Sequence, residues 1–330
     1  MKKIRVIHFG LGPIGCGMAR LVAQRESLEI VGAVDVNPNL IGKSLNEVAG
    51  IDKDLTIKIM GSLSEVLKTT SADIVVHTTS SYFDIFKPQL LEIISHGLNI
   101  VSTAEELSFP WHHHAAEGKE IDDAAKAKGV TVLGTGINPG FLMDSLPINL
   151  TSIAQKVNHF DIKRAQNASK RRGPFQKKIG AGMTPAEFKI AMASGRMGHV
   201  GLPESMAMLF ATFNKKLVTY KEKIMPVIAK KQTTTSFFDV AAGNVIGLRQ
   251  TARGFSESGE FCKMTFVAYL DNREDRDTIK LSGSPDLRIT LEGTNGDIGT
   301  AAITINAIKR VVQASAGLVT MKDLPSAHCE

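Results

Sequence analysis

Two adjacent glutamates, Glu105 and Glu106, are the residues of this chain best suited by type and position to acid–base chemistry. They follow the stretch NIVST, residues 99–103, whose apolar and β-branched residues predict a buried strand. A carboxylate there can hold an ammonium group, stabilise a developing iminium, or act as the base for water. We expect Glu105 to be catalytic and Glu106 to be structural. The alternative for Glu105 is a carboxylate that merely complements the dipole of a helix start.

A second chemical pattern is GLGPIG, residues 10–15, which directly follows an apolar strand and precedes a segment with helical spacing. Gly10, Gly12 and Gly15 fill G-x-G-x-x-G, which in a strand–turn–helix–strand unit predicts dinucleotide binding. The phosphates are then expected at the helix start. Asp35 ends the second strand 20 residues after Gly15, and its charge favours NAD over NADP, although some enzymes with this aspartate use both.

The rest of the first half repeats the alternation of strands and helices. Its near-continuous apolar strands predict a parallel, doubly wound sheet buried on both faces. Ligands of such sheets bind at the carboxyl ends of the strands, where hydroxyl side chains and the turn GTGINPG, residues 134–140, also fall. The residues expected to bind the cofactor are therefore Gly10, Gly12, Pro13, Ile14, Gly15, Asp35, Thr78, Thr79, Thr103 and Asn138.

After about residue 145 the pattern changes to α+β. Strand-like segments at 156–166, 245–255, 260–270, 277–283 and 286–293 predict a mostly antiparallel sheet, and a long helix is expected at 300–317. The expected organisation is a Rossmann domain at 1–145, a substrate and dimerisation domain at 146–300, and a C-terminal helix at 301–330 that packs back on the first domain.

A basic loop, SKRRGPFQ, opens the possibility of binding an acidic ligand. It lies in a region, Lys163 to Lys231, that holds fifteen Lys or Arg against three Glu. Arg171 or Arg172, with Gln176 nearby, is expected to hold a carboxylate because the guanidinium fork binds it through two hydrogen bonds. A solvated surface loop is the alternative.

One histidine of the second half also has two readings. His199 stands between glycines in GRMGHVGLPES. It is expected either to bind substrate or to cap the next helix.

Several classes of protein are disfavoured by composition. The chain has no apolar run of membrane-spanning length, no nucleic-acid-binding motif, and three cysteines without zinc or redox spacing, which together favour a cytoplasmic protein. The three consecutive histidines 112–114 point in different directions at a helix start, so we expect no metal site.

Several longer stretches resemble a known family. STAEELSFPW, GTGINPGFLMDSLP, SKRRGPFQKKIGAG, GHVGLPES and TAAITINAIKRVVQASAGLVTMKDLP are similar to the 2,4-diaminopentanoate dehydrogenases and their amine dehydrogenase relatives, in the dihydrodipicolinate-reductase-like group. The resemblance implies oxidative deamination of 2,4-diaminopentanoate to 2-amino-4-oxopentanoate and ammonia with NAD or NADP, in ornithine breakdown. It implies a homodimer, a catalytic Glu105 and a pocket threonine at Thr300.

One difference separates this sequence from the dihydrodipicolinate reductases of the wider group. The histidine pair and lysine that dihydrodipicolinate reductases carry in the second domain are missing here, which disfavours cyclic imine reduction. The alternatives that remain open are a dehydrogenase or imine reductase of other small amines or ketones, and a dinucleotide-binding sensor without turnover.

Overall fold

The computed structural model describes residues 2–53, 55–193, 195 and 197–329. Its contacts divide the chain into two compact units. The first unit comprises Met1–Ser145 with Asn295–Glu330, and the second comprises Leu146–Thr294. The C-terminal segment joins the first unit from Asn295, ahead of the boundary expected at residue 301, because helix α10 (Gly296–Gln313) already begins there.

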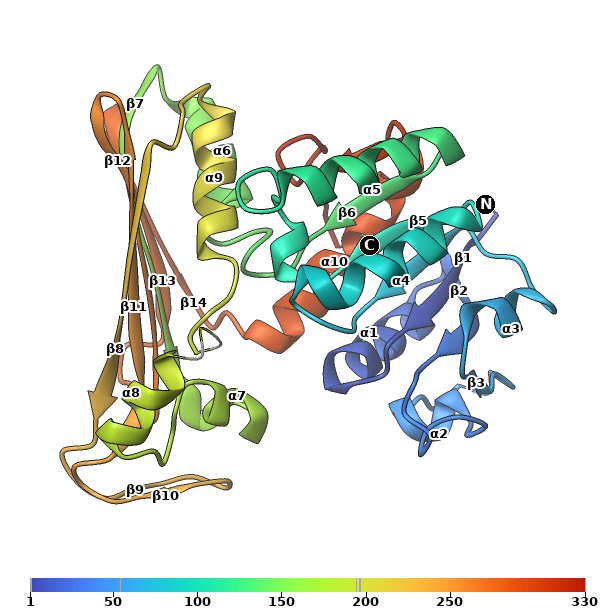
Figure 1. Ribbon diagram of the computed structural model, residues 1–330, viewed down its shortest axis with the longest axis horizontal. Coiled ribbons are helices and arrows are strands. Elements are labelled where there is room, and N and C mark those ends of the chain that lie inside the picture. Colours follow the sequence, from blue (N-terminus) through green and yellow to red (C-terminus); the bar gives the residue numbers. More distant parts are fainter. Residues whose placement is uncertain (1, 54, 194, 196, 330) are drawn as a thin grey trace. The chain divides into compact units, whose positions relative to one another are not determined.

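The first unit is built on a parallel sheet with strand order β15-β6-β5-β4-β1-β2-β3. This is the doubly wound order of dinucleotide-binding folds, extended by one edge strand. Figure 1 labels β1, β2, β3, β5 and β6 of this sheet. Its strands are β1 (Ile4–Phe9), β2 (Leu28–Val34), β3 (Ile59–Met60), β4 (Ile74–His77), β5 (Asn99–Ser102), β6 (Thr131–Gly134) and β15 (Gly317–Val319). Its helices are α1 (Pro13–Gln24), α2 (Leu45–Ala49), α3 (Leu63–Leu67), α4 (Phe83–Ser95), the short η1 (Glu105–Leu107), α5 (Ala115–Lys128) and α10.

Helix α4 shows how the sequence pattern produces this layer. Phe83, Phe86, Leu90, Ile93 and Ile94 recur at helical spacing and are buried in one core with residues of β1, β4, α3 and α5. Burying each such side chain contributes roughly 1.5–3 kcal/mol. Helices α1 and α10 pack against each other, and α10 also lies against β4, β5 and β6.

The second unit is built on a mixed sheet with strand order β14-β13-β7-β12-β11-β8. Neighbouring strands are antiparallel except β7 and β12, which are parallel. The strands are β7 (Lys156–Asn167), β8 (Thr219–Ile228), β11 (Val245–Ser256), β12 (Gly259–Tyr269), β13 (Arg276–Ser284) and β14 (Leu287–Glu292), with the separate pair β9 (Thr233–Thr234) and β10 (Asp239–Val240). The helices are α6 (Ser145–Leu150), η2 (Thr151–Ile153), η3 (Ala168–Lys170), α7 (Gly173–Lys178), α8 (Pro185–Ala193) and α9 (Leu202–Thr212).

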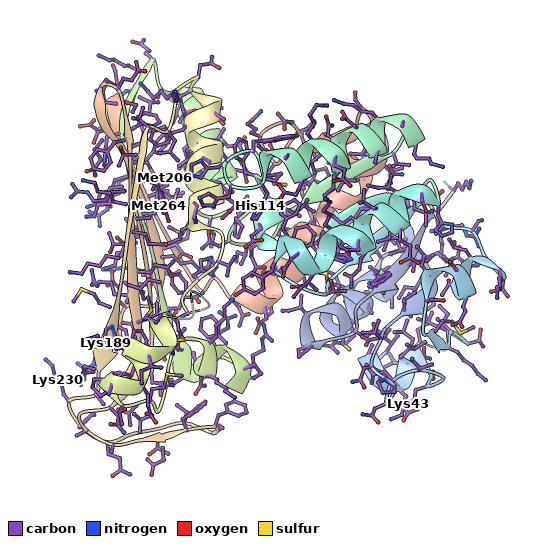
Figure 2. The ribbon with its side chains drawn as sticks, in the orientation of Figure 1. Lys43, His114, Lys189, Met206, Lys230 and Met264 are labelled. Atoms are coloured by element: carbon purple, nitrogen blue, oxygen red, sulfur yellow. The ribbon has the colours of Figure 1, made fainter. Side chains whose placement is uncertain are left out.

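Helix α9 packs on the middle of this sheet. Met206 of α9 and Met264 of β12 are both fully buried (Figure 2). A Cβ at Gly254 of β11 would lie 2.3 Å from the sulfur of Met206, so the side chain of Met206 occupies the space that a larger residue would need.

The expected fold class is confirmed, and strand β8 and the end of the last helix are among the elements that differ from the expectation. Strand β8 was not predicted, because its lysines, its glutamate and Pro226 weaken the strand pattern. The last helix ends at Gln313 and not at Gly317. Gly317 has a φ of +131° and is the first residue of strand β15. Within the described residues, every helix is too short or too polar to cross a membrane.

Candidate active site

The glycine turn between β1 and α1 is held by close backbone contacts. Gly10 has a φ of +98°, and a Cβ there would lie 2.6 Å from the carbonyl oxygen of Thr78. A Cβ at Gly15 would lie 2.0 Å from the carbonyl oxygen of Gly10. Both positions therefore require glycine for packing inside the protein.

Gly12 is different, because no atom lies within 4 Å of the place its Cβ would take. It is the N-cap of α1, Pro13 occupies the first turn, and no acidic residue of this fully described helix lies in that turn. The N–H groups of a helix start have no partner within the helix and attract anions. The space at Gly12 therefore fits the pyrophosphate of a dinucleotide.

Asp35 follows β2, and its carboxylate is oriented by the backbone. One oxygen accepts a hydrogen bond from Leu11 N at 2.6 Å and the other from Asn37 N at 2.8 Å. The carboxylate thus joins the glycine turn to the end of β2, which is the place expected for recognition of a ribose.

The hydroxyl groups after β4 have partners inside the unit. Thr78 Oγ1 donates to the carbonyl oxygen of Gly10 at 2.6 Å, and Thr79 Oγ1 donates to Gln89 Oε1 at 2.6 Å. Thr78 therefore holds the glycine turn, and Thr79 belongs to a network around His77. Thr103, after β5, is fixed through its backbone, whose N–H donates to His77 O at 3.1 Å.

The two glutamates after β5 have different environments. Glu106 Oε2 accepts a hydrogen bond from Phe83 N at 2.7 Å, at the start of α4, and lies 3.4 Å from His114 Nε2. Among the residues that the structure describes, no hydrogen bond or ion pair involves the carboxylate of the half-buried Glu105. Its backbone is held instead, because Ser108 donates to Glu105 O through both N and Oγ, at 3.1 and 2.7 Å.

The turn after β6 brings together residues that are distant in sequence. Ile137 N donates to Thr300 Oγ1 of α10 at 3.4 Å, so Thr300 lies directly against this turn. Asn138 is 8% exposed and precedes a cis bond to Pro139. Asp144 was not selected from the sequence; it is fully buried and accepts a hydrogen bond from Gly140 N at 2.7 Å. An acidic residue inside an apolar stretch is the signal that would have found it.

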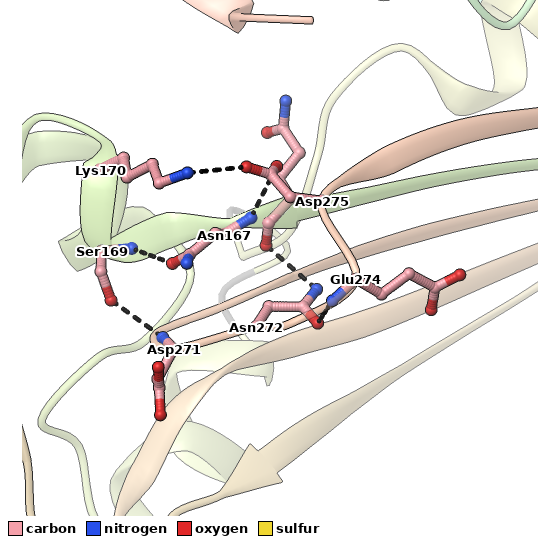
Figure 3. A network of polar contacts seen from close by, with 8 residues as sticks. Asn167, Ser169, Lys170, Asp271, Asn272, Glu274 and Asp275 are labelled. Atoms are coloured by element: carbon pink, nitrogen blue, oxygen red, sulfur yellow. Dashed lines mark hydrogen bonds and ion pairs between the residues drawn. The ribbon is translucent and has the colours of Figure 1, made fainter. Parts of the chain in front are cut away.

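In the second unit, the basic loop SKRRGPFQ, residues 169–176, is anchored at its start by polar contacts (Figure 3). Asn167 N donates to Asp275 Oδ1 at 3.1 Å, and Asp271 N donates to Ser169 Oγ at 2.9 Å. Lys170 Nζ lies 3.5 Å from Asp275 Oδ2. These contacts tie the end of β7 to the turn between β12 and β13.

The buried side chain of Gln176 stabilises the same loop through hydrogen bonds. It is fully buried, its Nε2 donates to the carbonyl oxygen of Arg171 at 2.8 Å, and its Oε1 accepts from Thr235 Oγ1 at 2.9 Å. Arg171 Nη1 donates to Gln166 Oε1 at 2.9 Å, and its guanidinium lies 4.1 Å from the ring centroid of Phe175. The structure therefore gives Gln176 an internal role in fixing the backbone of Arg171.

His199 is held through its backbone by Gln250 of β11. His199 N donates to Gln250 Oε1 at 2.7 Å, and Gln250 Nε2 donates to His199 O at 3.0 Å. The imidazole stacks on Phe266 with 4.6 Å between ring centroids. The alternative of a helix cap is wrong, because the N-cap of α9 is Gly201, with a φ of +102°.

A buried ion pair in the second unit was also not selected from the sequence. Arg164 and Asp277 are 2% and 3% exposed, and Arg164 Nε lies 3.9 Å from Asp277 Oδ1. Burial lowers the pKa of Arg164 to about 10 and raises the pKa of Asp277. Across the described part of the chain, no group of three or more metal-binding side chains is placed to hold a metal ion.

The doubly wound sheet with its glycine turn, joined to a unit with a mixed sheet, defines the class of this protein as a two-unit protein with a dinucleotide-binding fold of the Rossmann type. A sequence model described as "2,4-diaminopentanoate dehydrogenase C-terminal domain" matches residues 141–330. The chain belongs to the 2,4-diaminopentanoate dehydrogenase family.

One relative in sequence agrees with this assignment, and two solved structures share the fold. The chain is 31% identical to 2,4-diaminopentanoate dehydrogenase of Acetoanaerobium sticklandii, over 98% of this chain and 94% of that one. Its fold is similar to that of amine dehydrogenase from Mycobacterium smegmatis, with a TM-score of 0.89, 24% identity, and coverage of 99% and 97%. It is also similar to the WlbA dehydrogenase of Chromobacterium violaceum in complex with NADH and UDP-GlcNAcA, with a TM-score of 0.51, 17% identity, and coverage of 88% and 74%.

Proposed function

We propose that this protein oxidatively deaminates 2,4-diaminopentanoate to 2-amino-4-oxopentanoate, a step of ornithine breakdown, as a homodimer. The substrate ammonium group, NAD⁺ and water yield the ketone, ammonium, NADH and one proton. The family supports this substrate, and a solved structure of similar fold that is described with NADH supports a nicotinamide cofactor. NAD is the expected form because of Asp35, and NADP is the alternative cofactor of the same site.

The observation that carries the proposal is the carboxylate of Glu105 at the end of β5. Because it has no hydrogen bond or ion pair among the described residues, whereas Glu106 caps α4, it is available to a ligand. In the proposed reaction the Glu105 carboxylate holds the ammonium group, which loses one proton to solvent before hydride transfer. The ionised carboxylate then stabilises the iminium and acts as the base for the water that hydrolyses it.

The bound dinucleotide supplies the acceptor for the hydride. The open space at Gly12 and the start of α1 would hold its phosphates, and Asp35 would hold a ribose. Asn138 and Thr300, which line one turn of the same unit, are proposed to contact the nicotinamide and the substrate respectively.

The proposed partner of the substrate carboxylate is Arg171 or Arg172. Both lie on the loop that Gln176 fixes, and a guanidinium binds a carboxylate through two parallel hydrogen bonds. A simple alkyl amine has no carboxylate and would gain nothing from these residues, which is why the diamino acid is preferred over the alternative substrates.

The test is an initial-rate assay of NADH formation at alkaline pH with 2,4-diaminopentanoate and, separately, with 2-aminobutane. Turnover of the diamino acid alone supports the proposal, and comparable rates with 2-aminobutane would assign the protein to the general amine dehydrogenases. Glu105→Gln should lower kcat about 10²- to 10⁴-fold and leave NADH binding unchanged. A sensor without turnover would show no NADH formation in the wild type either.

A further inference from the structure

His77 is a fully buried histidine at the end of β4, and its side chain reaches toward the segment that carries Glu105. Its Nδ1 lies 2.9 Å from Ser102 Oγ, at the end of β5, and its Nε2 lies 2.8 Å from Gln89 Oε1 of α4. Neither the glycine fingerprint nor the proposed chemistry uses this residue.

The chemistry of the partners determines the direction of each hydrogen bond. Gln89 Oε1 can only accept, so Nε2 of His77 carries the hydrogen and Nδ1 is an acceptor. Ser102 Oγ therefore donates to His77 Nδ1, and its lone pair accepts from Ala104 N at 3.1 Å. Burial lowers the pKa of His77 to about 4, which keeps the ring neutral as this arrangement requires.

The backbone of His77 makes a second contact to the same segment. Its carbonyl oxygen accepts a hydrogen bond from Thr103 N at 3.1 Å. His77 thus fixes both residues that directly precede Glu105: Thr103 through its own backbone, and Ala104 through Ser102. Opposite, a Cβ at Gly134 of β6 would lie 2.6 Å from the carbonyl carbon of Leu107, so the turn has little room to move.

We propose that His77 is a positioning residue that acts through Ser102 to hold the Ala104–Glu105 turn, and with it the carboxylate of Glu105, in the geometry that the reaction needs. This inference rests on the proposed function, in that Glu105 is taken as the catalytic group. A displacement of about 1 Å in such a group can lower the rate roughly 10²-fold.

The test compares His77→Phe, His77→Asn, Ser102→Ala and the double variant His77→Phe/Ser102→Ala. The matched control is His8→Phe, because His8 is also a fully buried histidine of the same sheet and neither of its ring nitrogens has a hydrogen-bond partner among the described residues. The measurements are kcat, KM, NADH binding, and amide hydrogen exchange of residues 103–106 without substrate.

His77→Phe and Ser102→Ala should each lower kcat roughly 10- to 100-fold at unchanged NADH affinity, and the double variant should be no slower than the slower single one. His77→Asn, whose Oδ1 can still accept from Ser102, should recover most of the loss. Exchange at residues 103–106 should rise in His77→Phe and Ser102→Ala but not in His8→Phe.

Multiplying effects of the two substitutions, or full kcat and unchanged exchange in Ser102→Ala, would overturn the positioning role. If the wild type does not oxidise the diamino acid, the proposed function fails, and hydrogen exchange still decides whether His77 and Ser102 hold this turn. If His77→Phe does not fold, the kcat and hydrogen exchange of Ser102→Ala and His77→Asn decide whether His77 positions Glu105.

Discussion

Replacing two glycines of the same turn should have opposite consequences. In Gly15→Ala the new Cβ would lie 2.0 Å from the carbonyl oxygen of Gly10 and 2.7 Å from Thr78 Oγ1. The backbone must therefore shift by about 1 Å or more, and forcing a methyl into such a space costs roughly 1–3 kcal/mol. In Gly12→Ala nothing lies within 4 Å of the new methyl, and φ at this residue is −65°, which alanine adopts without strain.

The two variants are compared by urea unfolding and by calorimetric titration with NADH. Gly15→Ala should lower the free energy of unfolding by roughly 1–3 kcal/mol, which corresponds to about 2–4 °C in Tm per kcal/mol. Gly12→Ala should unfold like the wild type or be up to about 1 kcal/mol more stable, because alanine restricts the unfolded chain. Its Kd for NADH should nevertheless rise about tenfold or more, which is at least about 1.4 kcal/mol, since the methyl takes the space of the phosphates.

The result that would refute this reasoning is a Gly12→Ala variant that binds NADH as tightly as the wild type. The open space at Gly12 would then not be where the phosphates bind. A Gly15→Ala variant with unchanged stability would show that the turn relaxes more easily than its contacts with Gly10 and Thr78 imply.

Three further substitutions test other parts of the structure. Glu106→Gln should lower the free energy of unfolding by about 1 kcal/mol through its weaker contact with Phe83 N, and should leave kcat within a few-fold of the wild type; a loss as large as that of Glu105→Gln would exchange their roles. His8 has a pKa lowered by burial from 6.5 to about 4, so its unfolded form takes up more protons and the free energy of unfolding falls as the pH drops from 6.5 to 4. His8→Phe should reduce the loss between pH 7 and about pH 5 by about 2 kcal/mol in urea unfolding, and an unchanged loss would contradict a neutral buried ring. Gln176→Ala removes the hydrogen bond to Arg171 O and should raise KM for the diamino acid more than it lowers kcat. Initial rates that show an unchanged KM would contradict this prediction.

Much of the first unit was predictable because its signals are local. The apolar strands and the spacing of the three glycines depend on residues close in sequence, and the structure shows the sheet that they predict. The second unit was less predictable from the sequence. Strand β8 lies at an edge, where charged side chains and Pro226 are tolerated, so its pattern did not mark it as a strand.

The candidate site was also predictable only in part. That a carboxylate follows β5 is visible in the sequence, and so is the pair of glutamates from which one had to be chosen. The partner of Glu106 is Phe83 N, 23 residues away, and no periodic pattern carries that contact. The choice of Glu105 as catalytic stays a prediction, now with a structural reason.

The sequence by itself determined the glycine turn, the parallel sheet and the residue types at the ends of its strands, because backbone conformation and apolar periodicity are properties of short segments. Only the tertiary structure decided which polar groups remain available to a ligand. Thr78 binds the carbonyl oxygen of Gly10 across 68 residues, and Gln176 binds Thr235 across 59. A hydrogen bond of this kind forms wherever folding brings a donor to an acceptor, and that distance is set by the packing of the whole unit.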